Sequence, residues 1–200
     1  MNESTQPRAI AIWDPFVRLA HWTVVAAFLT AYITGGEPRG IHTAAGYLLA
    51  AYVGLRVVWG FVGPERARFA SFVRSPISAI GYLVDLLRGR ATRHLGHSPA
   101  GGLMIVLLLL ALSATTSAGM MLYALHDGGG PLAGVVASET PAPPAGDRED
   151  PRVEFWEESH ELLANLTLLL VLLHIGGVVV ASIAHRENLV KAMITGRKRP

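Results

Sequence analysis

Long apolar stretches alternate with polar segments along this chain of 200 residues. Four stretches reach the roughly 20 mostly apolar residues that a transmembrane helix needs. They lie at about 17–34, 42–61, 102–123 and 160–183, and the third contains the run LMIVLLLLAL. The pattern predicts an all-α fold, an integral membrane four-helix bundle that occupies residues 1–200 as one domain.

The segments between the stretches differ in pattern. Segment 62–97 contains SPISAIGYLVDLL, in which Ile77, Ile80, Val84 and Leu87 recur at helical spacing. This spacing predicts a short helix on the membrane surface. Segment 124–158 is rich in Gly, Pro, Ala and acidic residues, and it predicts an external loop that is mobile over about 127–152.

Composition agrees with a membrane location. Hydrophobic residues make up 51% of the chain and charged residues 16%, against about 25% charged residues in soluble domains. The formal charge of +2 conceals a segregation, because arginines and lysines gather in 62–97 and 186–199 while acids gather in 124–158. The positive-inside rule then predicts that both termini face the cytoplasm.

Cysteine is absent. The chain therefore has no disulfide, thiolate zinc site, cysteine-bound iron–sulfur cluster or covalently attached haem of the C-x-x-C-H type. Histidine remains as the strong nitrogen ligand for a metal, with eight copies.

Four histidines lie in or at the ends of the apolar stretches: His21, His42, His160 and His174. Ionisable groups inside a membrane are costly and indicate functional sites. His160 and His174 are 14 residues apart, which places them about 21 Å apart along one face of a helix. With alternating helix directions, His21 pairs with His174 near the inner surface, and His42 pairs with His160 near the outer surface.

Each predicted pair offers two imidazoles on opposing helices. A zinc ion needs four ligands, and no Met or Cys stands beside the pairs to favour copper. Two facing imidazoles with an apolar slot between them suit the axial ligation of haem iron, and helix bundles build cofactor sites in this way. Gly46, Gly176 and Gly177 lie close to the histidines and would let a porphyrin approach, although glycine is also common at helix contacts.

Two arginines are candidate partners for the haem propionates. Arg18 lies three residues before His21 on the same helix face, and Arg56 lies 14 residues after His42. Charge-assisted hydrogen bonds from a guanidinium suit a carboxylate. The alternative is that both arginines extend to the inner membrane boundary without a bound partner.

Several motifs together are similar to those of a known family. They are WDPFVRLAHW (13–22), GIHTAAGY (40–47), RVVWGFVGPERARFASF (56–72), GHSPAGGLM (96–104), SHELLANL (159–166), LLHIGGVVVAS (172–182) and ENLVKAMITGRKR (187–199). In these motifs the chain resembles the bacterial cytochrome b561 family, which includes the b-type cytochrome subunits of nickel–iron hydrogenases. The resemblance implies a four-helix cytochrome of the bacterial inner membrane with two non-covalent haem b groups, and axial ligands His21, His42, His160 and His174.

The resemblance further implies electron transfer between the membrane quinone pool and a periplasmic or membrane redox protein, within membrane lipid and without nucleic acid. Quinone oxidoreductase activity stays open, and no catalytic residues are predicted. The alternatives are the anchor subunit of a hydrogenase-like complex and a haem-free transporter whose histidines relay protons. Reaction of the outer haem with oxygen species is disfavoured by the acidic surroundings of that site.

Overall fold

The computed structural model describes residues 10–35, 38–139 and 150–199. Four long helices dominate it: α1 (Pro15–Thr34), α2 (Arg39–Val62), α5 (Pro99–Asp127) and α7 (Pro151–Ala184). All four are long and apolar enough to cross a membrane. The predicted all-α membrane bundle is confirmed.

Helix starts follow a simple local rule. The helices α1, α4 (Pro76–Leu87), α5 and α7 each begin with proline at the first turn, directly after an aspartate or serine cap. The cap accepts backbone N–H groups that the first turn leaves unpaired, and proline needs no such partner there. At α1, for example, Asp14 Oδ1 accepts from the backbone N–H of Phe16 at 2.7 Å.

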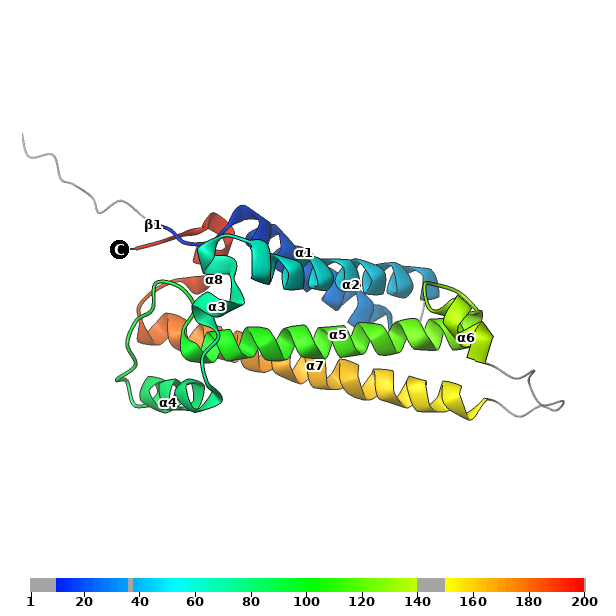
Figure 1. Cartoon of the computed structure of the whole chain (residues 1–200). Helices are drawn as coiled ribbons and strands as arrows, with labels where there is room; N and C mark the ends of the chain where they lie inside the picture. Colours follow the sequence, from blue (N-terminus) through cyan, green and yellow to red (C-terminus); the bar gives the residue numbers. More distant parts are fainter. Residues whose placement is uncertain (1–9, 36–37, 140–149, 200) are drawn as a thin grey trace, which may run out of the picture.

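The helices form a bundle in which α1 packs on α2, α2 on α5 and α5 on α7 (Figure 1). The first and last described residues, Ile10 and Arg199, lie at one end of the bundle, together with α3 (Phe69–Phe72), α4 and α8 (Leu189–Thr195). We call this the termini end. The opposite end carries α6 (Ala133–Glu139), and we call it the loop end.

An apolar layer fills the bundle between its two ends. Ala27 and Phe28 of α1 pack against Leu49 and Val53 of α2 and Leu112 of α5. The outward faces of the helices are apolar too, with Leu162, Leu169, Leu172, Leu173 and Ile183 all more than 50% exposed. Such a surface suits a lipid environment, because lipid tails replace water around it.

The termini end is closed by the C-terminal segment. Strand β1 (Ile10–Ala11) pairs antiparallel with β2 (Arg197–Lys198). Glu187 is buried and accepts from Arg93 at 3.0 Å, while Lys198 Nζ lies 3.5 Å from its other carboxylate oxygen. These contacts fix the tail against the segment that precedes α5.

The predicted amphipathic helix in 62–97 is present as α4. Its Ala79, Tyr82 and Leu86 are buried against α5, whereas Ile77 and Leu87 are about four-fifths exposed. The loop predicted over 124–158 is partly wrong. The α5 helix continues to Asp127, α6 is helical, and α7 begins at Pro151, because the Asp150–Pro151 start signal overrides the polar composition of its first turns.

Candidate functional site

The structure brings the four membrane histidines together in the predicted pairs. At the loop end, the rings of His42 from α2 and His160 from α7 have centroids 5.9 Å apart. At the termini end, the rings of His21 from α1 and His174 from α7 have centroids 6.4 Å apart. The pairs thus lie on either side of the apolar layer.

Both imidazoles of the loop-end pair are held by helix carbonyls. His42 Nδ1 lies 2.9 Å from the Ala31 carbonyl oxygen of α1, and His160 Nδ1 lies 3.0 Å from the Thr115 carbonyl oxygen of α5. Since a carbonyl can only accept, both Nδ1 atoms carry the proton. Each Nε2 then presents a lone pair, which is the arrangement of a metal-ligating histidine with an oriented ring.

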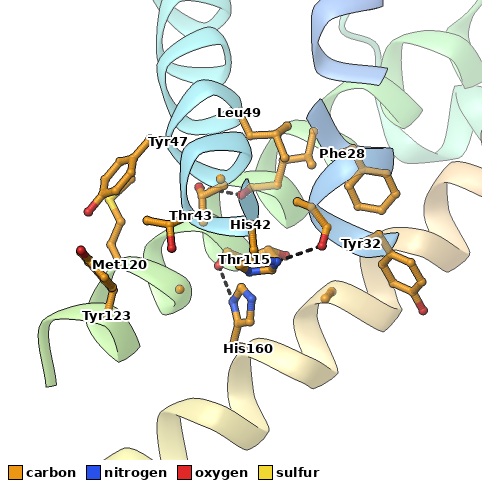
Figure 2. A pocket seen from close by; sticks show the side chains of 16 residues that line it. Phe28, Tyr32, His42, Thr43, Tyr47, Leu49, Thr115, Met120, Tyr123 and His160 are labelled. Atoms are coloured by element: carbon orange, nitrogen blue, oxygen red, sulfur yellow. Dashed lines mark hydrogen bonds between the residues drawn. The ribbon is translucent and has the colours of Figure 1, made fainter. Parts of the chain in front are cut away.

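A pocket surrounds this pair, and its empty space is about 680 Å³ when the open mouth is included. Figure 2 shows His42 and His160 projecting toward each other from facing helices. The walls are mostly apolar and include Phe28, Leu49 and Leu112.

Two tyrosines of the cavity wall differ in their hydroxyl groups. Tyr32 donates to Asn165 Oδ1 at 2.9 Å. The Tyr47 hydroxyl is buried and has no hydrogen-bond partner among the residues that the structure describes. Gly130, at φ +80°, leaves the room that this hydroxyl occupies, because a Cβ there would overlap it. A buried donor of this kind calls for an acceptor that the described residues do not supply.

The termini-end pair is built differently. His21 Nδ1 is buried without a hydrogen-bond partner. Its ring lies edge-on to Trp22, at 5.1 Å between centroids. The orientation of the His21 ring comes from packing, whereas the loop-end rings are fixed by hydrogen bonds.

Further unpaired donors gather at the termini end. Arg18 Nε, Arg56 Nη1 and Trp59 Nε1 are buried and have no hydrogen-bond partner within residues 10–35, 38–139 and 150–199. Other nitrogens of both guanidinium groups are held, since Arg18 donates to the Ile194 carbonyl and Arg56 donates to the Ala67 carbonyl at 3.2 Å. The Arg56 guanidinium also lies over the Phe69 ring, 5.2 Å from its centroid. Both arginines are therefore held at the same end of the bundle as His21 and His174, and each keeps hydrogen-bonding capacity to spare, as an anionic ligand would require.

His97 directly precedes the cap of α5 and packs among aromatic rings. Ser98 caps α5, and the His97 ring lies between Trp13 and Phe72, 4.5 Å from each ring centroid. Burial, together with the charges of Arg56 and Lys198, lowers the pKa of His97 to about 3. The ring is therefore neutral at physiological pH and serves as a packing element of the termini end.

The two pairs can be tested for fit to a metal. A metal–imidazole bond is about 2.0 Å long and the ring nitrogen lies about 1.1 Å from the ring centre, so two rings across one ion have centroids about 6 Å apart. The observed 5.9 and 6.4 Å match this spacing. Within the described ranges, no group of three or more His, Cys, Asp or Glu side chains could hold an ion. A metal between two such rings needs its other ligands from a non-protein group, and a porphyrin supplies four.

Sequence reasoning missed several contributors to these sites. Tyr47 gave no signal, because tyrosine is ordinary in an apolar span and Tyr52 lies in the same one. The carbonyls of Ala31 and Thr115 belong to helices that supply no ligand to this pair, and a backbone acceptor has no residue type to reveal it. Glycine four residues after each carbonyl, Gly35 and Gly119, was the available hint.

The chain is similar to known proteins over most of its length. A family model described as prokaryotic cytochrome b561 matches residues 12–196. A protein of Rhizobium leguminosarum bv. viciae named "Probable Ni/Fe-hydrogenase B-type cytochrome subunit" is 27% identical, over 98% of this chain and 92% of its own length. A protein of Azotobacter chroococcum mcd 1 with the same name is 26% identical, over 94% and 88%. No solved structure matches.

Proposed function

The chain belongs to the prokaryotic cytochrome b561 family, and from this we propose that it carries electrons across a membrane through two haem b groups, one at each end of its bundle. Membership makes it a multi-pass membrane cytochrome b, an electron carrier that binds haem b. The number of haems, their ligands and the exchange partners form the proposal. The observation that carries it is the two opposed histidine pairs, at 5.9 and 6.4 Å.

The residues have distinct parts in this proposal. His42 and His160 bind one iron, and His21 and His174 bind the other. When bound, haem supplies one-electron iron chemistry. The apolar cavity around the loop-end pair excludes water, and the apolar layer keeps the two sites apart.

Polar groups near each pair orient the cofactor. Arg18 and Arg56 each keep a buried nitrogen with no partner at the termini end, which suits the propionate carboxylates. Tyr47 keeps its unpaired hydroxyl at the loop end, where it donates to a propionate oxygen. Each of these donors would remain buried and unsatisfied without such an acceptor, at a cost of about 1–3 kcal/mol.

A reduced-minus-oxidised absorption spectrum of the purified protein tests the proposal first. We expect b-type bands and a haemochrome content of two haems per chain. One haem per chain would contradict the two-site proposal. Absence of b-type bands from protein isolated with haem available would favour the alternative in which the histidines relay protons.

The electrons have two proposed exchange partners, the quinone pool and a redox protein. A second candidate function narrows the protein partner to a hydrogenase, and it is favoured by the printed names of both relatives. Anoxic native membranes supplied with hydrogen distinguish the two. Reduction of the b-type bands by hydrogen, with quinol oxidation blocked, supports the hydrogenase partner, and reduction by quinol alone supports the general carrier.

Orientation is proposed from charge. The segments that flank α3 and α4 are rich in arginine, and they gather at the termini end with α8 and the C-terminal segment, which carry further lysines and arginines. Glu154, Glu157 and Glu158 of α7 lie exposed at the loop end. By the positive-inside rule the termini end faces the cytoplasm of a bacterial inner membrane. Reporter fusions at Gly89 and after Pro200 should read cytoplasmic, and a fusion at Gly134 should read periplasmic. The reverse pattern would exchange the two faces.

A further inference from the structure

One glycine of α5 lies directly against a proposed iron ligand. A Cβ at Gly119 would be 2.9 Å from His160 Cε1 and 3.2 Å from His160 Nδ1. Real Cβ atoms essentially never approach a neighbour closer than 3.0 Å. The edge of the imidazole therefore occupies the space that any side chain at position 119 would take. A Cβ at Gly46, in the same cavity wall, would meet nothing within 4 Å.

The same glycine uncovers the carbonyl that holds His160. Thr115 lies four residues before Gly119 in α5, so its carbonyl oxygen faces position 119 along the helix. Because Cβ bonds in a helix tilt toward the N-terminus, a side chain at 119 would stand beside this oxygen. With glycine there, His160 of α7 reaches the carbonyl at 3.0 Å.

The contact with the Thr115 carbonyl sets the tautomer of His160 and leaves its Nε2 free to bind a metal. The Thr115 carbonyl has a second lone pair beyond the one used within the helix, and it accepts the Nδ1 proton. The proton is thereby placed on Nδ1, and Nε2 is left to face His42. Donation to a carbonyl also raises the basicity of a ligating imidazole.

We propose that Gly119 and the Thr115 carbonyl form a notch that positions His160 and sets its strength as an iron ligand. The inference rests on the proposed ligation by His42 and His160. Gly119 is a positioning residue, since it acts through His160 and the Thr115 carbonyl. Only glycine allows both the close approach of the ring and the exposure of the oxygen.

A simpler role for Gly119 is to let α5 and α7 pack closely against each other. Packing and positioning predict different results. A packing defect would lower the stability of the whole bundle and affect both haems alike. A positioning defect changes one haem, and it changes its reduction potential.

The test is Gly119→Ala in the full-length protein purified with haem. We expect either loss of one of the two haems, or a rise in the midpoint potential of that haem, because an imidazole without its carbonyl partner donates less charge to iron and favours the reduced form. The second haem should keep its potential. Gly54→Ala is the matched control, since a Cβ there meets nothing within 4 Å and the residue lies in α2 away from the cavity wall.

Two outcomes would overturn the notch. One is Gly119→Ala with two haems and both potentials unchanged, and the other is an equal change at both haems. If Gly119→Ala does not accumulate, nitrogen NMR of histidine-labelled wild-type protein in the reduced state decides. A proton on His160 Nδ1 protected from solvent exchange supports the notch, and an unprotonated or freely exchanging Nδ1 overturns it.

His160→Ala separates this inference from the proposed function. If His160→Ala keeps both haems, the proposed ligation is wrong and the notch falls with it. If His160→Ala loses one haem while Gly119→Ala behaves like wild type, the ligation stands and the notch alone is wrong.

Discussion

The two histidine pairs differ in what orients their rings and in the charges that surround them. At the loop end, carbonyls of α1 and α5 fix both rings, and the nearby side chains are neutral. At the termini end, His21 Nδ1 has no such bond among the described residues, and the half-buried Arg18 and Arg56 each keep one buried, unpaired nitrogen at this end. One site is defined by hydrogen bonds to its ligands, and the other by charge around it.

This difference has a consequence for electron transfer. Donation of Nδ1–H to a carbonyl strengthens an imidazole ligand and lowers the potential of its haem, whereas nearby positive charge raises it. Because the two effects act on different haems, both widen the difference in potential between the two sites. We therefore expect the His42–His160 haem to have the lower potential and the His21–His174 haem the higher potential.

Removal of a ligand gives the largest expected effect on this comparison. His42→Ala should reduce the haem content from two per chain to one, and the remaining haem should be the high-potential one. His21→Ala should also leave one haem, now the low-potential one. Haemochrome assays with redox titration measure both.

The two variants serve as controls for each other. If both variants left haems of equal potential, the proposed asymmetry would be wrong. If either kept two haems, that histidine would not be a ligand. A quinol analogue added to each variant further identifies which end exchanges electrons with quinone.

The comparison also shows what the sequence could provide. The pairing of four histidines followed from helix geometry, because a spacing of 14 residues fixes both depth and face. The helix starts could have been predicted more closely from Asp14–Pro15, Ser98–Pro99 and Asp150–Pro151, which carry the cap-and-proline signal. Hydropathy alone placed those starts several residues too late.

Other features depend on contacts between distant segments. Pairing of Ile10–Ala11 with Arg197–Lys198 joins the two ends of the chain, and two-residue strands leave no period to detect. The α6 helix is short and follows three glycines, so its composition indicated a loop. Backbone carbonyls acting on His42 and His160 leave no trace in residue types. Each of these features needed the packed bundle to be seen.

The next largest effect is on stability, and it is expected when Glu187 loses the charge that pairs with Arg93 and Lys198. Burial raises the pKa of Glu187, but the hydrogen bond from Arg93 and the charge of Lys198 outweigh it, so the pKa lies below its usual range. Glu187→Gln should lower the stability of the termini end by about 1.5–3 kcal/mol at neutral pH, because two cations lose their anionic partner. Thermal unfolding followed at each haem band measures it, and the loop-end haem should respond less.

The pH dependence of this loss has a defined sign. A carboxyl whose pKa is lowered on folding stabilises the protein above its unfolded pKa, about 4.3, and the contribution disappears as pH falls through the folded pKa. The difference between wild type and Glu187→Gln should therefore be full at pH 7 and shrink below about pH 4. A constant difference down to pH 3 would contradict this account.

The charge of Arg56 gives a smaller effect, restricted to one haem. A unit charge about 10 Å away at an effective dielectric constant of about 20 changes the energy of one electron by about 1.7 kcal/mol, or about 70 mV. Arg56→Gln should lower the high potential by an amount of this order and leave the low potential unchanged. Arg56→Lys keeps the charge and should retain most of the potential, so equal shifts in both variants would assign the effect to packing against Phe69 and Phe72.

The smallest effect is expected from substitution of Tyr47, which tests whether the loop-end site has a specific donor for its haem. Its buried, unpaired hydroxyl should donate to a haem propionate, and Tyr47→Phe removes this bond, worth about 0.5–1.5 kcal/mol. We expect weaker haem retention at this site and a small fall in the low potential. The hydrogen bond offsets part of the negative charge of the propionate, and without it that charge favours the oxidised iron. Tyr32→Phe is the matched control in the same cavity, since the Tyr32 hydroxyl is already bonded to Asn165. Equal effects of the two substitutions on haem retention would show that the cavity responds to any lost hydroxyl, and that Tyr47 has no specific acceptor.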